Sequence, residues 1–390
     1  MTLRIYLLSA LLLLARLLAA QDIHRIDGSK ISMDSLDHRI QKLMAKAKVT
    51  GLCIAVFNKN TPVFTKAYGY ADAPLKIPLT TAHVMYSASF SKAVFAYIAM
   101  KMVEAGTIEL DSPLVSYLDK PLMDYKFDAP GRGYQDLRND LRYKKITARM
   151  CLDHTSGLVN YRSSEPDRKL KILFEPGTKY SYSGEGMLLL QFVIEQLTDK
   201  DIESIAGQKV FRPMHMTHTS YVWKDDFTEM FSMPHDNTGK CYPVTKVKDA
   251  DCSASLHTSM DDYIRFFTVV LEQRGLKKSS YKEIMTPQVR IKSKQQFGGN
   301  AFVETNDNDK VELSYGLGFG LLSTPYGKAF FKDGHDSGWQ HYSIGFPDRD
   351  IAVIIMTNSD NGESIFKELL ATSIADTFTP WYWENYIPKE

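Results

Sequence analysis

The chain of 390 residues has few cysteines, no excess charge of either sign and no internal repeat. Its 47 Lys and Arg residues against 46 Asp and Glu residues leave a formal net charge of +1. This balance gives no indication of a nucleic acid or an acidic surface as partner, because both attract a concentration of basic charge. Low-complexity tracts are also absent, and the length suffices to bury a sizeable core. These absences favour a globular protein of one large domain or two coupled halves.

Only four cysteines occur in the sequence. Cys53 and Cys151 lie in apolar stretches and are expected to be buried thiols. Cys241 and Cys252 flank a polar loop and are the better candidates for one disulfide, with two free thiols as the alternative. A chain with its own large core does not depend on such a bridge.

Long apolar runs are absent except at the N-terminus. Arg4 precedes an apolar run over residues 5–15, and small residues follow it. This pattern predicts a secretory signal peptide over 1–20, cleaved after Ala20. The run is short for a membrane span and Arg16 interrupts it, so an uncleaved anchor is the alternative. We therefore expect an exported protein, periplasmic or secreted, with no membrane contact beyond the signal segment.

Strand patterns occur near both ends of the chain, with helix patterns between them and beside them. Residues 52–57 and 62–70 are rich in strand-forming side chains and are joined by a turn at 58–61, which predicts a hairpin. Amphipathic helix patterns cover 34–47 and 363–378. Further stretches typical of strands lie at 315–322, 327–332, 342–346 and 351–357.

Together these patterns predict a mixed α/β (α+β) fold. One antiparallel sheet flanked by helices is built from both chain ends, and a helical half is inserted between them. We assign 33–84 and 290–380 to the sheet half and 85–289 to the mostly helical half. Within the latter, 123–144 is polar and predicted to be a surface excursion. Its basic residues form either a solvated face or a rim that attracts anionic substrates.

One short segment combines a helix start with a nucleophile and a base. Residues 86–92 end an extended stretch with a cluster of hydroxyl side chains, and an apolar helix follows to about Glu104. Ser89 and Lys92 are three residues apart, so they share one face of a helix. A serine in the first turn lies near unpaired N–H groups, which favour developing negative charge. A lysine beside it in a dry pocket can act as base. Alone, the pattern is weak evidence for a catalytic pair and favours a serine-capped helix with an exposed lysine.

Other stretches give this segment its meaning. The segments around Ser89 and Lys92 resemble the nucleophile region of the serine β-lactamase and penicillin-binding-protein superfamily, and later segments resemble further motifs of it in the same order. The resemblance is closest to the class C β-lactamase-like branch, which also holds D-aminoacyl peptidases and esterases. It covers roughly residues 35–375 and implies a β-lactamase/transpeptidase-like fold. It is carried by 89–92, 103–111, 146–158, 176–183, 213–216, 315–320 and 334–335.

The resemblance also implies catalytic roles. Ser89 would attack a carbonyl carbon and form an acyl-enzyme. Lys92 would be the base, or would share the proton with Tyr182. Tyr182 matches the family tyrosine that passes a proton to the leaving group and activates water for deacylation.

The third motif of the superfamily corresponds to residues 335–338. His335 would supply the cationic or hydrogen-bonding side chain that binds a substrate carboxylate. An oxyanion would be bound by backbone N–H groups, for which Ser89 and Gly338 are the candidates. His154, in contrast, is expected to be a structural, hydrogen-bonding histidine.

Two departures from the family pattern bear on the substrate. Gly184 stands where the family usually has an asparagine, whose side chain contacts the acylamide of β-lactams and peptides. Ser337 stands where a glycine is usual, which crowds the strand edge or shifts the motif by one residue. Both departures retain the acylation machinery and weaken the case for an efficient β-lactamase.

The sequence as a whole predicts a serine hydrolase that acts as a monomer without a cofactor. His215 and His218 have ligand-like spacing but no acidic partner at the required position, so no metal site is expected. The expected partner is a small molecule or short peptide: a β-lactam, a D-amino acid peptide or an acyl ester. The alternative is a penicillin-binding-like protein that binds or senses its ligand with little turnover.

Overall fold

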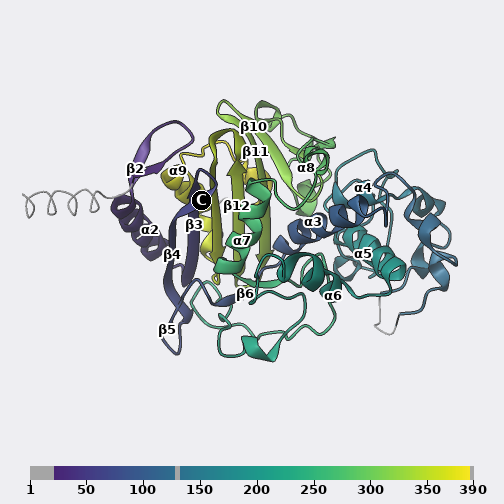
Figure 1. The fold of residues 1–390 in the computed structure, drawn as a ribbon, viewed down its shortest axis with the longest axis horizontal. Helices are drawn as coiled ribbons and strands as arrows, with labels where there is room; N and C mark the ends of the chain where they lie inside the picture. The colour runs from purple at the N-terminus through teal and green to yellow at the C-terminus, as the bar shows by residue number, and fades with distance from the viewer. Residues whose placement is uncertain (1–21, 128–131, 387–390) are drawn as a thin grey trace, which may run out of the picture.

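The computed structural model describes residues 22–127 and 132–386, so the expected signal segment at 1–20 lies outside the described residues. Within them a nine-stranded antiparallel sheet has the strand order β5-β4-β3-β13-β12-β11-β10-β9-β8 and forms the centre of Figure 1. Its strands are β3 (Gly51–Asn58), β4 (Thr61–Asp72), β5 (Ile77–Pro78), β8 (Val289–Arg290), β9 (Ser314–Tyr315), β10 (Gly320–Thr324), β11 (Gly327–Asp336), β12 (Trp339–Phe346) and β13 (Ile351–Thr357).

The sheet joins the two ends of the chain. The C-terminal strand β13 pairs along its whole length with β3, from Ile351 opposite Asn58 to Thr357 opposite Leu52. The hairpin predicted over 52–70 is β3 and β4, with a register shift between Val56 and Phe57. The predicted fold class, an antiparallel sheet from both ends with helices around it, is confirmed.

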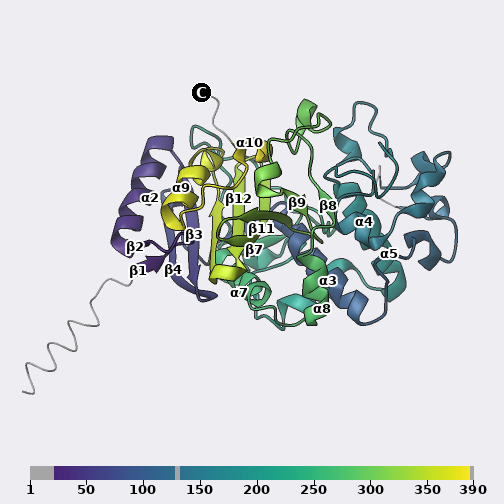
Figure 2. The ribbon, with the colours of Figure 1, turned by 90° about the horizontal axis from the view of Figure 1, so that it is seen from above.

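Helices cover both faces of this sheet. Successive side chains of a strand point to opposite faces. The even-numbered residues of 52–56 pack into one core with α2 (Met33–Ala47) and α9 (Phe366–Ser373). The odd-numbered residues of 53–57 pack into a second core with α3 (Phe90–Glu104) and α7 (Met260–Leu271). Figure 2 shows the two helix layers on either side of the strands. Burial on both faces explains why β3 is apolar throughout rather than alternating.

A mostly helical region lies at one end of the sheet, on the right of Figure 1. It contains α4 (Ala148–Leu152), α5 (Gly184–Thr198) and α6 (Ile202–Ala206), and α8 (Lys278–Ile284) lies near the edge strands. None of the helices in the described part of the chain is long and apolar enough to cross a bilayer. Shorter elements are β1 (Asp22–His24), β2 (Lys30–Ser32), β6 (Val84–Tyr86), β7 (His257–Ser259) and α10 (Trp381–Glu384).

Some local expectations differ from the structure. Cys241 and Cys252 are free thiols rather than a disulfide. Cys252 is fully buried, and its thiol donates to the carbonyl oxygen of Met187 at 3.4 Å, so burial rather than a bridge accounts for it. The polar stretch 123–144 contributes buried side chains in its described part, among them Tyr125, Tyr134, Leu137 and Tyr143.

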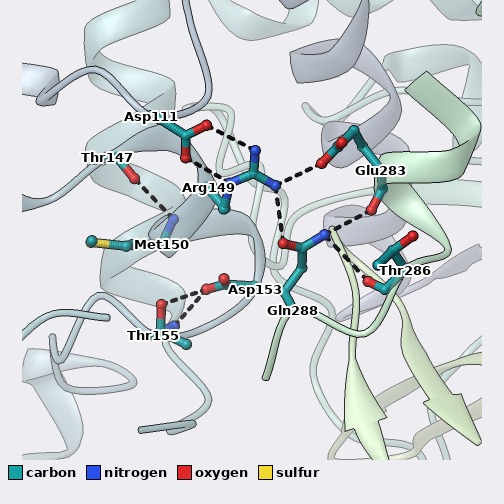
Figure 3. Close-up of polar contacts among 9 residues, drawn as sticks. All are labelled: Asp111, Thr147, Arg149, Met150, Asp153, Thr155, Glu283, Thr286 and Gln288. Atoms are coloured by element: carbon teal, nitrogen blue, oxygen red, sulfur yellow. Dashed lines mark hydrogen bonds and ion pairs between the residues drawn. The ribbon is translucent and has the colours of Figure 1, made fainter. Parts of the chain in front are cut away.

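Arg149 ties the helical region to the edge of the sheet (Figure 3). Its Nε and Nη2 atoms donate to the two carboxylate oxygens of Asp111 at 2.7 and 2.9 Å. Its Nη1 donates to Glu283 at the end of α8 at 2.8 Å and to Gln288 at 3.0 Å. The backbone N–H of Gln288 in turn donates to Tyr315 of β9. One guanidinium thus links α4, α8 and the outer strands.

Replacing Arg149 with methionine is expected to lower the free energy of unfolding by about 1–2 kcal/mol, because hydrogen bonds to charged groups are lost at a half-buried position. Urea denaturation measures this loss. Lys145→Met is the matched control, since the ion pair of Lys145 with Glu175 is exposed on both sides and is expected to contribute less than about 0.5 kcal/mol. Equal losses in the two variants would contradict a bridging role for Arg149.

Candidate active site

Ser89 stands at the start of α3 and lines a cleft of about 420 Å³. The residue before it, Ala88, has a φ of +45°. A left-handed conformation costs a residue with a Cβ roughly 1 kcal/mol, so surrounding contacts hold this turn in place. The cleft is lined by Tyr86, Ala88, Ser89, Asn160, Tyr161, Tyr182, Ala254, Phe297, Asp333, His335 and Asp336.

Lys92 lies one turn into α3 and is fully buried. Its Nζ atom lies 3.0 Å from Ser89 Oγ, 2.6 Å from the carbonyl oxygen of Ser253 and 3.4 Å from the hydroxyl of Tyr161. Burial, followed by the positive charge of Lys332, lowers the pKa of Lys92 to about 7. A substantial fraction of Lys92 is therefore neutral at neutral pH and able to accept the proton of Ser89.

Tyr182 comes from the turn before α5 and lies between the side-chain nitrogens of two lysines. Lys92 Nζ is 4.7 Å from the centre of its ring, and Lys332 Nζ is 5.1 Å from it. Lys332 also donates a hydrogen bond of 3.1 Å to the Tyr182 hydroxyl. Burial, with the charge of Asp333 next, raises the pKa of Tyr182 well above its usual value. Tyr182 is therefore a neutral phenol at rest, and Lys92 is the better base.

Lys332 of β11 is a charged group that the sequence did not single out. Its Nζ atom lies 2.6 Å from Asp333 Oδ1, and both side chains are buried. Burial opposes the charge of each, but the carboxylate holds the pKa of Lys332 above its usual value and the ammonium holds the pKa of Asp333 below its own. The cleft therefore contains an ionised pair beside Tyr182.

His335 lies at the cleft, whereas Ser337 and Gly338 do not. The ring of His335 forms an ion pair with Glu363, which outweighs burial and raises the pKa of the imidazole. Ser337 and Gly338 are the two-residue turn between β11 and β12, because Asp336 pairs with Trp339. The N–H of Gly338 donates to Asp360 at 2.6 Å and is not placed to bind an oxyanion.

The open edge of β11 offers another N–H group at this place. β11 pairs with β10 only as far as Phe331, so the edge beyond it faces the cleft. In an antiparallel hairpin closed by Asp336 and Trp339, the N–H of Asp336 points to β12 and that of His335 points the other way. The backbone N–H of His335 therefore takes the place expected for Gly338.

Gly184 begins α5 and is covered by Tyr161. A Cβ atom at position 184 would lie 2.4 Å from the Tyr161 ring, so the ring fills the space of a side chain there. The N–H of Gly184 donates to the side chain of Asn160 at 3.0 Å. The residues that line the cleft at this point are Asn160 and Tyr161. They lie more than twenty residues before Gly184 in the sequence and belong to none of the motifs.

The model of the β-lactamase family matches residues 36–374 of the chain. The chain belongs to the β-lactamase family. The superfamily assignment made from the ordered motifs is therefore confirmed.

This β-lactamase family member is 24% identical over 342 residues to the D-aminopeptidase of Brucella anthropi, a match that covers 86% of the chain and 61% of that relative. The octameric penicillin-binding protein homologue from Pyrococcus abyssi matches it with a TM-score of 0.69 at 18% identity, over 89% of this chain and 80% of the other. D-alanine carboxypeptidase AmpC from Burkholderia cenocepacia matches it with a TM-score of 0.67 at 16% identity, over 87% of this chain and 98% of the other. At these identities the structural likeness concerns the fold.

His154 supports the site of this family member from behind. Its Nδ1 atom accepts the backbone N–H of Ser183 at 3.2 Å, and its ring centre lies 4.3 Å from that of Tyr182. Burial, then the charges of Lys92 and Lys332, lowers its pKa well below the usual value, so the ring is neutral. This is the structural, hydrogen-bonding position that the sequence predicts for it. No group of three potential metal ligands gathers in residues 22–127 or 132–386.

Proposed function

We propose that this β-lactamase family member is an exported serine hydrolase that cleaves small amides or esters through an acyl-enzyme on Ser89. The observation that carries the proposal is the contact between Lys92 Nζ and Ser89 Oγ at 3.0 Å, made by a buried lysine whose pKa is lowered to about 7. A serine in contact with a neutral amine is an activated nucleophile.

Acylation follows from the positions of the three side chains. Neutral Lys92 removes the hydroxyl proton as Ser89 Oγ attacks the carbonyl carbon, and the N–H groups of Ser89 and His335 receive the developing oxyanion. Tyr182 donates its proton to the leaving group, and the transient phenolate lies between Lys92 and Lys332. In deacylation the phenolate takes a proton from the attacking water, and Lys92 returns its proton to Ser89 Oγ. All protons are thereby restored.

The proposed substrates are small acyl compounds: esters, D-amino acid peptides or β-lactams. The activities named for the D-aminopeptidase relative and for the D-alanine carboxypeptidase structure support this range. Gly184 and Tyr161 replace the asparagine amide that the family resemblance assigns to acylamide binding, which ranks β-lactams behind the other classes. Export is proposed from residues 1–20 alone. We propose that a monomer is sufficient for activity, because one chain already brings a nucleophile, a base and a proton donor together in Ser89, Lys92 and Tyr182.

Chemical labelling of the folded protein tests this proposal. A fluorescent fluorophosphonate is expected to label the wild-type chain, and mass spectrometry of the labelled peptide is expected to place the adduct on Ser89. A panel of p-nitrophenyl esters, nitrocefin and D-Ala-D-Ala peptides then identifies the acyl group. A folded protein that reacts with neither the fluorophosphonate nor a fluorescent penicillin would instead be a binding or sensing protein.

A further inference from the structure

A neutral lysine has two N–H groups and one lone pair, and their directions decide whether it acts as a base. Lys92 Nζ has three oxygen neighbours: Ser89 Oγ, the carbonyl oxygen of Ser253 and the Tyr161 hydroxyl. The lone pair faces Ser89 only if both N–H groups are directed to the other two oxygens. The carbonyl of Ser253 can only accept a hydrogen bond. The direction of the Tyr161 hydroxyl therefore decides the orientation of Lys92.

A chain of hydrogen bonds sets the direction of that hydroxyl. Tyr161 lies 2.9 Å from Ser253 Oγ, and Ser253 Oγ lies 2.5 Å from Asp251 Oδ1. An ionised carboxylate only accepts, so the Ser253 hydroxyl must donate to Asp251. Ser253 Oγ is then an acceptor for the Tyr161 hydroxyl, and Tyr161 has only its lone pairs left for Lys92. Both hydroxyl groups in this series of hydrogen bonds therefore donate in the direction of Asp251 and away from Lys92.

The backbone on either side of Tyr161 is fixed against the start of α5. Asn160 accepts the N–H of Gly184 with its side chain, at 3.0 Å, and the N–H of Glu185 with its carbonyl oxygen, at 2.9 Å. Arg162 forms a buried ion pair with Glu185 at 2.7 Å. The absent side chain at Gly184 leaves the space that the Tyr161 ring fills. Tyr161 therefore occupies the space that a side chain at position 184 would take, and the residues on either side of it are bound to the start of α5.

We propose that Tyr161, oriented by Ser253 and Asp251, is a positioning residue that directs the lone pair of Lys92 at Ser89. The proposal rests on the proposed function, since it concerns the base of the same acylation step. It gives a task to two residues, Ser253 and Asp251, that lie outside every motif of the sequence.

The test measures the rate of fluorophosphonate labelling of Ser89 across pH. Tyr161→Phe and Ser253→Ala are each expected to lower the maximal rate about 10–100-fold, because Lys92 loses the acceptor that fixes one N–H. The double variant is expected to be no slower than Tyr161→Phe alone, because both changes break one chain. Tyr134→Phe and Ser163→Ala are matched controls on the wall of the neighbouring cavity and are expected to label at the wild-type rate.

Asp251→Asn gives a second, independent measurement. The charge of Asp251 raises the pKa of Lys92, so its removal is expected to shift the acidic limb of the labelling profile to lower pH. A loss of folded protein would lower the labelling rate by the same factor at every pH and would leave the pH of the acidic limb unchanged. The other titratable groups that face Lys92 are Lys332 and Asp333 from β11, Cys252 beside Asp251, Tyr182, and His154 from the loop after α4.

Wild-type labelling rates in folded Tyr161→Phe, or additive losses in the double variant, would overturn the proposal. If Tyr161→Phe does not fold, Ser253→Ala and the pH profile of Asp251→Asn decide in its place, and an unchanged rate with an unmoved limb would overturn it. A wild-type chain that is not labelled at Ser89 would refute the proposed function itself, which is a different result.

Discussion

Replacing Ser89 with alanine is expected to reduce turnover of every substrate to background, at least about 10⁴-fold below wild type, because it removes the serine hydroxyl that lines the cleft 3.0 Å from Lys92 Nζ. The same change is expected to alter the free energy of unfolding by less than about 0.5 kcal/mol. The reason is that the Ser89 side chain makes no capping hydrogen bond to α3, although it occupies the N-cap position. Steady-state kinetics and urea denaturation on one preparation measure both quantities.

Ser259→Ala is the matched control for this change. Ser259 caps α7, and its side chain accepts the backbone N–H of Asp262 at 3.2 Å. Its removal is expected to cost about 1 kcal/mol of stability and leave kinetics near wild type, the opposite of Ser89→Ala. Turnover that survives in Ser89→Ala would exclude Ser89 as the nucleophile, even if the fluorophosphonate labels Ser89 in the wild-type protein.

The contrast between these two serines shows what the sequence alone could establish. Both precede an apolar helix and fit the same N-cap pattern, so local spacing did not distinguish a capping serine from a reactive one. The ordered motifs did, because they placed Ser89 in a family whose fold is then confirmed by the sheet and the family match. The strand-forming apolar run of β3 and the helical spacing of α2 are local properties, and the sequence predicted both elements.

The surroundings of Lys92 depended on contacts between distant parts of the chain. Tyr161, Ser253 and Lys332 lie 69, 161 and 240 residues from Lys92, and loop and strand-edge geometry brings them together. The hydrophobic periodicity of the sequence does not indicate contacts between such distant residues. The third motif was assigned from its residue types alone. In the structure Ser337 and Gly338 form a turn, with Gly338 at a φ of +74°. The turn removes them from the cleft and leaves His335 and Asp336 as the motif residues that line it.

Replacing Tyr182 with phenylalanine is expected to lower kcat/KM about 100-fold or more, because the leaving group then departs without a proton donor. The ring is retained between Lys92 and Lys332, so the fold and the packing of the cleft are expected to survive. The loss is expected to be larger for amides and for esters of poor leaving groups than for p-nitrophenyl esters, whose anion needs no proton. An equal loss for all leaving groups would contradict the proton-donor role.

Lys332→Met separates the two effects of the second ammonium group. Through its hydrogen bond Lys332 stabilises the transient Tyr182 phenolate, so its removal is expected to add little to the loss in Tyr182→Phe. Through its charge it lowers the pKa of Lys92, so its removal raises that pKa above about 7 and moves the acidic limb of kcat/KM to higher pH. This shift is opposite in sign to that of Asp251→Asn. In the Tyr182→Phe background the hydrogen bond is absent but the charge of Lys332 remains, so Lys332→Met is still expected to shift the acidic limb. If the limb does not shift in that background, Lys332 acts only through Tyr182.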